Sequence, residues 1–372
     1  MRKIFLTLFS FLLLTACNAS VIEGTGDQPV KTVKLGVLTS LSGDAAALGM
    51  EIQKVLDYQV EKVNQQTNDY QFELVYEDGK CSGAESVLAF QKLVDFDQVD
   101  FVLGGTCSSE TLAVAPIAQN NKILLLSGWS SNPDVEKEGD FVFTISYNDD
   151  VVGQGIAKEL NRYKKIAIIT EQNDYNIGLQ KVVRENLDSD VTIIADETFP
   201  KGSSDFRNML EKVAVSQPEV LFLNPNVGIT AENLLKQLAE IPALADVQLV
   251  SQYAYLTDAS RINAAKADEG MIIIDAPTLS SPEFQQVYKA FEAEKGAIEA
   301  LGMYYTASSM DALDILTETI QSEGPDPAKV KNALRKKSFE GYIGKIYFGE
   351  NNFVQNIPVS RFIVQNGEAV NQ

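Results

Sequence analysis

The chain has 372 residues, 45% of them hydrophobic, and a formal net charge of −20. It contains no histidine, which excludes Ser-His-Asp and Cys-His catalysis as well as any histidine-ligated metal site. So acidic a chain also argues against nucleic acid or anionic lipid as a general partner.

The chain start has the architecture of a secretory signal, with two basic residues, a short apolar run and small residues before a cysteine. The run is too short to span a bilayer as a helix. Leu14-Thr15-Ala16-Cys17 resembles the lipobox of bacterial lipoproteins, which predicts a signal peptide over 1–16 and a lipidated Cys17. Residues 17–30 would then form a flexible tether. The alternative is an ordinary signal that ends in cysteine.

The rest of the chain alternates apolar runs with amphipathic segments. Continuous apolar runs predict strands that are covered on both faces, and the stretches between them predict helices. Strand, helix and strand repeated in this way give parallel sheets, and we expect two Rossmann-like α/β lobes of four or five strands each. The predicted strands are 33–38, 72–76, 100–105, 122–127, 165–170, 191–196, 219–224, 247–252 and 270–275, and the predicted helices are 44–64, 82–96, 151–161, 174–187, 205–216 and 229–240.

Two cysteines remain if Cys17 carries lipid. In an exported protein such a pair, here Cys81 and Cys107, predicts a disulfide. Two separate buried thiols are the alternative.

The stretch "GGTCSSET", residues 104–111, follows one of the predicted strands directly. Ligands of open parallel sheets bind beyond the carboxyl ends of strands, where helix N-termini present free N–H groups. Two glycines allow close backbone approach there, and Ser108 and Ser109 add hydroxyl donors. The stretch predicts a site for a carboxylate-sized anion, with plain helix capping as the alternative.

Two further strand ends carry similar side chains. Gly128-Trp129-Ser130-Ser131 follows the fourth predicted strand and holds the only tryptophan of the chain, either as an apolar wall over a ligand or as ordinary loop packing. The segment "NDY", ending at Tyr175, follows the fifth predicted strand, in the second lobe.

Several segments, in order and at similar spacing, carry a family resemblance. They include "KLGVLTSLSGDAAALGMEIQ", "EDGKCSG", "GGTCSSET", "LLSGWSSNPDV", "NDDVVGQGIAKEL", "NDYNIGLQKVV", "YYTASSMDALDIL" and "GYIGKIYFGENN". From about residue 32 to 368 the chain resembles the leucine/isoleucine/valine-binding family of periplasmic binding proteins, the receptors of ATP-binding-cassette (ABC) importers. The resemblance implies the type I fold, with three hinge crossings. Lobe 1 would take 31–147 and 277–345, and lobe 2 would take 148–276 and 346–372.

The resemblance also implies ligand-binding positions. The serine after the second cysteine and the loop after the fourth strand hold the ligand carboxylate in amino-acid binders, which implies Ser108, Trp129, Ser130 and Ser131 here. Tyr175 matches an aromatic position that faces the ligand from the second lobe. Asp149 matches an acidic position at the first crossing that meets the ligand ammonium in some relatives.

Two positions depart from the amino-acid-binding pattern. The acidic residue of the second lobe falls near Tyr253, where the chain has no carboxylate, and Leu48 stands where some relatives have an aromatic residue. Tyr253 itself stands at a strand end of the second lobe and is a predicted ligand contact. Either Asp149 or Asp150 replaces the missing acid, or the ligand has a carboxylate or amide but no ammonium.

The sequence therefore predicts a monomeric solute-binding lipoprotein of an ABC importer, anchored outside the cytoplasm and working with permease subunits in the membrane. We expect no cofactor, no metal and no enzymatic activity, since the phosphate-binding, dinucleotide-binding and nucleophile-elbow motifs are missing from the sequence. A sensor of the same fold that signals to a membrane kinase or chemoreceptor is the alternative.

Overall fold

The computed structural model describes residues 30–66, 69–256, 261, 267–279, 281–350, 352–355 and 357–372. The predicted signal, Cys17 and nearly all of the tether lie outside these residues. Within the described part, no helix has both the length and the apolar character needed to cross a membrane.

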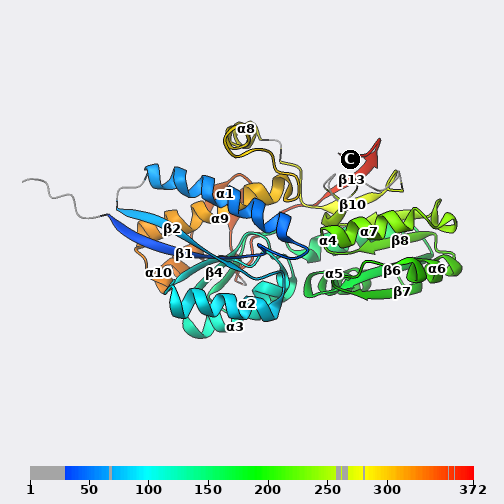
Figure 1. The fold of residues 1–372 in the computed structure, drawn as a ribbon, viewed down its shortest axis with the longest axis horizontal. Coiled ribbons are helices and arrows are strands. Elements are labelled where there is room, and N and C mark those ends of the chain that lie inside the picture. Colours follow the sequence, from blue (N-terminus) through cyan, green and yellow to red (C-terminus); the bar gives the residue numbers. More distant parts are fainter. Residues whose placement is uncertain are drawn as a thin grey trace, which may run out of the picture.

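The described residues form two α/β bodies side by side (Figure 1). The first contains a five-stranded parallel sheet in the order β2-β1-β3-β4-β5. Helices α1 and α9 pack together on one face of this sheet, and α2 and α3 on the other (Figure 1). Its strands are β1 (Lys31–Thr39), β2 (Tyr70–Asp78), β3 (Phe101–Gly104), β4 (Leu124–Ser127) and β5 (Val142–Thr144), and its helices are α1 (Ala46–Gln66), α2 (Gly83–Gln91), α3 (Ser108–Asn121), α8 (Pro282–Lys295), α9 (Gly302–Glu323) and α10 (Pro327–Leu334).

The second body contains a seven-stranded sheet in the order β14-β13-β10-β9-β8-β6-β7. The five strands from β10 to β7 are parallel, and β13 and β14 join the edge in antiparallel fashion. The strands are β6 (Lys165–Gln172), β7 (Thr192–Pro200), β8 (Val220–Asn224), β9 (Gln248–Ser251), β10 (Ile272–Asp275), β13 (Ser360–Gln365) and β14 (Glu368–Asn371), and the helices are α4 (Asp149–Leu160), α5 (Asp174–Glu185), α6 (Arg207–Ser216) and α7 (Ile229–Leu238).

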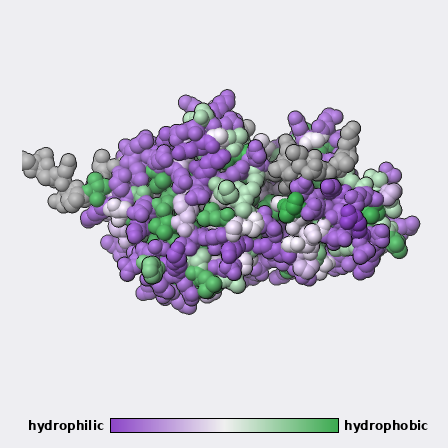
Figure 2. Space-filling view, in the orientation of Figure 1, coloured by the Kyte–Doolittle hydropathy of each residue, from purple (hydrophilic) through white to green (hydrophobic). Residues whose placement is uncertain are grey.

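The apolar pattern explains why these segments take these conformations. β3, β4 and β8 are buried at every position, as continuous apolar runs covered on both faces should be. Helix α1 buries Leu48, Ile52, Val55 and Leu56, which recur at helical spacing and form one stripe of the helix. Hydrophilic residues cover most of the visible surface (Figure 2).

The prediction of two α/β lobes with parallel sheets is confirmed, and all nine predicted strands are present. Strand β5 was missed because it has only three residues, and β13 and β14 were missed because they lie near the chain end without an intervening helix. They make the second sheet larger than the four or five strands expected. The short hairpin of β11 (Ser338–Gly341) and β12 (Gly344–Tyr347) was missed as well.

The segment after β12 differs from the predicted division of the chain. Phe353 pairs with Thr144 at the edge of the first sheet, and Phe348 packs edge-on against Phe143 at 5.0 Å between ring centroids. These contacts attach Phe348, Phe353 and Val354 to the first body, whereas the sequence assigned 346–372 to lobe 2. We propose that the last crossing follows Val354, while the other two crossings stay as predicted.

Candidate functional site

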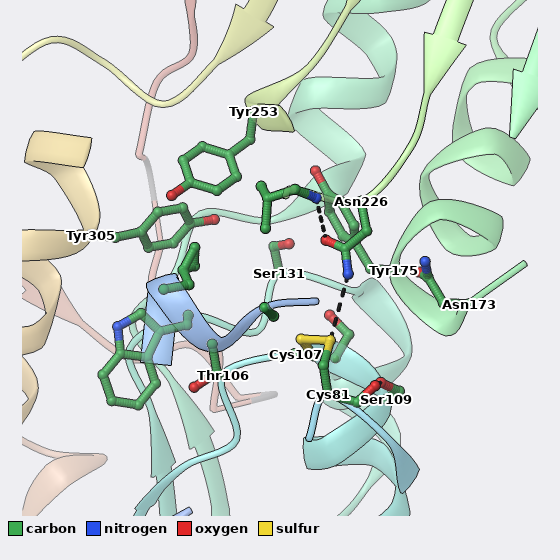
Figure 3. A pocket seen from close by; sticks show the side chains of 15 residues that line it. Cys81, Thr106, Cys107, Ser109, Ser131, Asn173, Tyr175, Asn226, Tyr253 and Tyr305 are labelled. Carbon is green, nitrogen blue, oxygen red and sulfur yellow. Dashed lines mark hydrogen bonds between the residues drawn. A yellow bond between two sulfur atoms is a disulfide. The ribbon is translucent and has the colours of Figure 1, made fainter. Parts of the chain in front are cut away.

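A pocket lies between the two bodies, at the carboxyl ends of strands from both sheets (Figure 3). Together with the open solvent at its mouth, the space between the lining residues is about 550 Å³. Turns after β2, β3 and β4 line it from the first body, and turns after β6, β8 and β9 from the second. The lining residues are Ala45, Leu48, Cys81, Thr106, Cys107, Ser108, Ser109, Trp129, Ser131, Asn173, Tyr175, Asn226, Val227, Tyr253 and Tyr305.

Six of the eight residues predicted to bind a ligand line this one pocket: Ser108, Ser109, Trp129, Ser131, Tyr175 and Tyr253. Their role in ligand binding stays a prediction. Ser130 and Asp149 do not line it, although both are completely buried. The Ser130 hydroxyl lies 2.5 Å from the Thr111 hydroxyl and donates to the Gly105 carbonyl oxygen at 3.0 Å, so it faces away from the pocket.

The N-terminus of α3 forms the floor of the pocket on the first body. The helix begins at Ser108, so Ser108 and Ser109 both belong to its first turn. The Ser109 hydroxyl donates to the Cys81 carbonyl oxygen at 3.4 Å. No hydrogen bond engages the Ser108 hydroxyl among the described residues, which leaves it available to a ligand at the positive end of the helix dipole.

The buried side chain of Glu110 stabilises the N-terminus of α3 through hydrogen bonds. Its carboxylate accepts hydrogen bonds from the backbone N–H of Cys81 and of Cys107, both at 2.9 Å, and from the Ser40 hydroxyl at 3.1 Å. Burial raises the pKa of Glu110 to about 7, although these donors favour its charged form. Glu110 therefore holds the turns of the two cysteines together without reaching the pocket.

The predicted disulfide between Cys81 and Cys107 is confirmed in the structure, with their Cα atoms 5.3 Å apart. It joins the turn after β2 to the N-terminus of α3, and both cysteines line the pocket (Figure 3).

Aromatic side chains form the wall near the hinge. Trp129 donates its indole N–H to the Ser309 hydroxyl at 3.0 Å, so its ring is fixed by helix α9. Tyr253 and Tyr305 meet edge to face at 4.9 Å between ring centroids (Figure 3). The Tyr175 hydroxyl donates to the Gln252 side-chain oxygen at 3.0 Å. With hydroxyl groups already engaged, these rings offer mainly apolar faces.

No residue in the described lining carries a charged side chain. From the second body, the amides of Asn173 and Asn226 and the hydroxyls of Tyr175 and Tyr253 supply its polar groups. Among the described residues, no cluster of three or more acidic, cysteine or histidine side chains could hold a metal ion.

Two carboxylates, those of Asp149 and Asp275, are buried behind the lining. Neither oxygen of Asp149 accepts a well-formed hydrogen bond from the described residues, and the same holds for Oδ2 of Asp275. Burial raises the pKa of Asp149 well above its usual range, and the nearby Ser131 hydroxyl offsets only part of this rise. Burial likewise raises the pKa of Asp275 to about 7.

The buried acids predict that stability falls as pH rises. Burial raises the pKa of Glu110, Asp275 and Asp311 to about 7 and that of Asp314 to about 6. Between about pH 4 and pH 7 the folded chain keeps protons that the unfolded chain releases, so the free energy of unfolding should fall through this window and level off above it. Thermal melts from pH 4.5 to 8 at high ionic strength, which screens surface charge, measure this.

Asp275→Asn removes one of the titrating carboxyl groups. We expect the melting temperature of this variant to fall less steeply with pH than that of the parent. A melting temperature that stays constant or rises from pH 4.5 to 7 would show that these carboxylates are ionised in the folded chain.

The sequence interpretation missed several lining residues. Asn226 follows the predicted strand 219–224, so the rule that ligands bind at strand ends could have found it. Asn173 stands two residues before Tyr175 and could have been found in the same way. Tyr305 lies inside helix α9 and reaches the pocket only through the packing of that helix, for which the sequence holds no local signal.

Known proteins resemble this chain over most of its length. An amino acid binding protein of Pseudomonas aeruginosa is 26% identical over 94% of each chain. The structure of a branched-chain amino acid transporter substrate-binding protein from Streptococcus pneumoniae, in complex with isoleucine, has a TM-score of 0.80 at 23% identity, covering 92% of this chain and 100% of that one. A solute-binding protein of an ABC transporter from Rhodopseudomonas palustris, in complex with p-hydroxybenzoic acid, has a TM-score of 0.82 at 19% identity, covering 92% and 96%.

The family described as periplasmic binding protein matches residues 32–366. With its two α/β bodies and the pocket between them, the chain belongs to the periplasmic binding protein family.

Proposed function

We propose that this protein is the extracytoplasmic solute-binding component of an ABC importer, which captures a small carboxylate-bearing molecule between its two lobes and delivers it to permease subunits. The observation that carries the proposal is the free Ser108 hydroxyl at the N-terminus of α3, inside a pocket lined from both sheets. Members of this family bind solutes rather than convert them, so the prediction against an enzyme is confirmed.

The uncharged lining supports a ligand with a carboxylate or amide on an apolar body. An anionic group of the ligand would meet hydroxyl donors and the N-terminus of α3 at one end of the pocket. An ammonium group in contact with the lining would meet no carboxylate. The ligand of one similar structure, p-hydroxybenzoic acid, has a carboxylate on a ring and no ammonium, whereas the isoleucine of another has both a carboxylate and an ammonium.

The buried carboxylate of Asp149, next to Ser131, supports an amino acid as a second ligand class. Asp149 has two oxygens without a well-formed hydrogen bond among the described residues, and a buried carboxylate is strongly stabilised by a cation. An ammonium would reach Asp149 only if Ser131 or a neighbouring tyrosine moved.

A thermal-shift screen separates these classes. Candidate ligands are L-leucine, L-isoleucine, benzoate, 4-hydroxybenzoate, their amides and short aliphatic carboxylates. A compound at 100 times its Kd should stabilise the folded state by about 2.7 kcal/mol. If carboxylates bind and the matching amino acids do not, the ligand is a carboxylate without an ammonium. If the amino acids bind and the matching carboxylates do not, the result supports the role of Asp149. If no small carboxylate or amide raises the melting temperature, the proposed function is wrong.

Lipidation of Cys17 gives a separate prediction about location. We expect Cys17→Ser to move the protein from the membrane to soluble fractions, because the motif at Leu14–Cys17 would otherwise place acyl chains on this residue, and two or more such chains hold a protein stably at a bilayer. Fractionation followed by immunoblotting measures the change, with Ser20→Ala, which lies outside the Leu14–Cys17 motif, as the control substitution. A cleaved Cys17→Ser chain that stays on the membrane would rule out the lipid anchor.

A further inference from the structure

The two bodies touch each other directly at the mouth of the pocket. Lys201, in the turn after β7 of the second body, donates from its ammonium group to the carbonyl oxygens of Lys80 at 2.9 Å and Cys81 at 2.8 Å. Both acceptors belong to the turn after β2 of the first body. The ammonium therefore joins the two bodies through two charge-assisted hydrogen bonds.

The acceptors of Lys201 are held in place from the first body. Cys81 is joined to Cys107 by the disulfide, and its N–H donates to the Glu110 carboxylate. A carbonyl fixed on both sides cannot follow Lys201 if the bodies separate, so opening the cleft must break these hydrogen bonds.

Other contacts cross the cleft beside Lys201. The Asn226 side-chain amide donates to Sγ of Cys81 at 3.5 Å (Figure 3). Gly228, at φ +99°, lies so close to the first body that a Cβ would stand 2.5 Å from the Asp44 carbonyl oxygen. On the other side of the cleft, Asn132 donates to the Asp174 carbonyl oxygen at 2.7 Å.

Lys201 does not line the pocket, unlike Cys81 and Asn226 beside it. The Lys201 ammonium also acts on a carboxylate of the second body, that of Glu171. Burial raises the pKa of Glu171, and Lys201 is among the groups that oppose this rise. Substituting Lys201 therefore tests closure without removing any lining residue.

We propose that Lys201 is a positioning residue, which holds the second body against the disulfide-bonded turn of Lys80 and Cys81. This contact populates the closed conformation without ligand. Ligand affinity then depends on a residue that does not touch the ligand. A contact made only in the closed state shifts the equilibrium by its own free energy, and ligand affinity changes by the change in the closed fraction. The inference rests on the proposed capture of a solute between the two lobes, but its test needs no solute.

Small-angle X-ray scattering of the ligand-free protein tests it. All variants carry Cys17→Ser to avoid acylation. Fitting the scattering curve of the parent should require a contribution from the closed conformation, as calculated from this structure. Lys201→Met keeps the length of the side chain and removes its donors, and it should lower the closed-to-open ratio roughly three- to tenfold, since the contact is partly exposed. The radius of gyration should rise accordingly.

Two matched variants separate latching from a general structural effect. Lys201→Arg keeps the charge and the donors and should restore the parent curve. Lys212→Met removes another surface cation of the second body, which pairs with Glu197 of β7, and should leave the curve unchanged. The proposal is overturned if the ligand-free parent is entirely open, or if Lys201→Met has the parent's radius of gyration. Either result leaves the pocket and its ligand class standing, because the thermal-shift screen tests those separately.

Discussion

Ser108→Ala is expected to weaken ligand binding by about 1.5–3 kcal/mol, roughly ten- to a hundredfold in Kd. The reason is the position of the Ser108 hydroxyl, which lines the pocket in the first turn of α3 and is engaged by no hydrogen bond among the described residues. We expect it to donate to the ligand carboxylate, and a hydrogen bond to a charged group is stronger than one between neutral groups. Calorimetric titration with a compound found by the thermal-shift screen measures the loss.

Ser130→Ala is the matched control for this prediction. Ser130 is equally buried, but its hydroxyl is engaged by Thr111 and Gly105 outside the pocket. Its removal should cost stability and leave Kd within about twofold, since no ligand contact is lost. Equal affinities of Ser108→Ala and the parent would place the anion site elsewhere.

Replacing both Cys81 and Cys107 by alanine is expected to lower the free energy of unfolding by about 3.5 kcal/mol, because the disulfide no longer restricts the unfolded chain over their separation of 26 residues. The variant should also bind ligand more weakly, since the turn of Cys81 forms part of the pocket. Urea unfolding followed by circular dichroism measures the stability.

Reduction of the parent is the control for the disulfide. With dithiothreitol present, the parent should unfold at the urea concentration of the double variant, whereas the variant should be unaffected. If the double variant is as stable as the oxidised parent, the two cysteines are not joined in solution.

The sheets could be predicted well because their strands are buried on both faces. A continuous apolar run such as "EVLFLN" can be recognised without knowing its neighbours, and the helices between such runs carry clear stripes, as α1 does. Short or peripheral strands have no such signal. β5 is a strand because β4 lies beside it, and Phe353 joins the edge of the first sheet only through its bridge with Thr144, which is far away in the sequence.

The candidate site could be predicted where it follows the strand-end rule. Ser108, Trp129, Ser131 and Tyr175 all stand just beyond strands, and all of them line the pocket. The direction of a side chain within such a turn was beyond prediction. Ser130 and Ser131 are neighbours, but only Ser131 faces the pocket. Asp275 and Lys201 gain their significance from contacts between distant segments, which the sequence pattern does not reveal.

The fluorescence of Trp129 tests the central claim, a solute held between the two lobes, most directly. It is the only tryptophan of the chain, it lines the pocket, and its side chain is fixed against Ser309. A small carboxylate or amide that raises the melting temperature should also change the tryptophan emission in a saturable titration, with the same Kd as calorimetry gives. A compound that stabilises the protein but leaves the emission of Trp129 unchanged at saturation would contradict binding in this pocket.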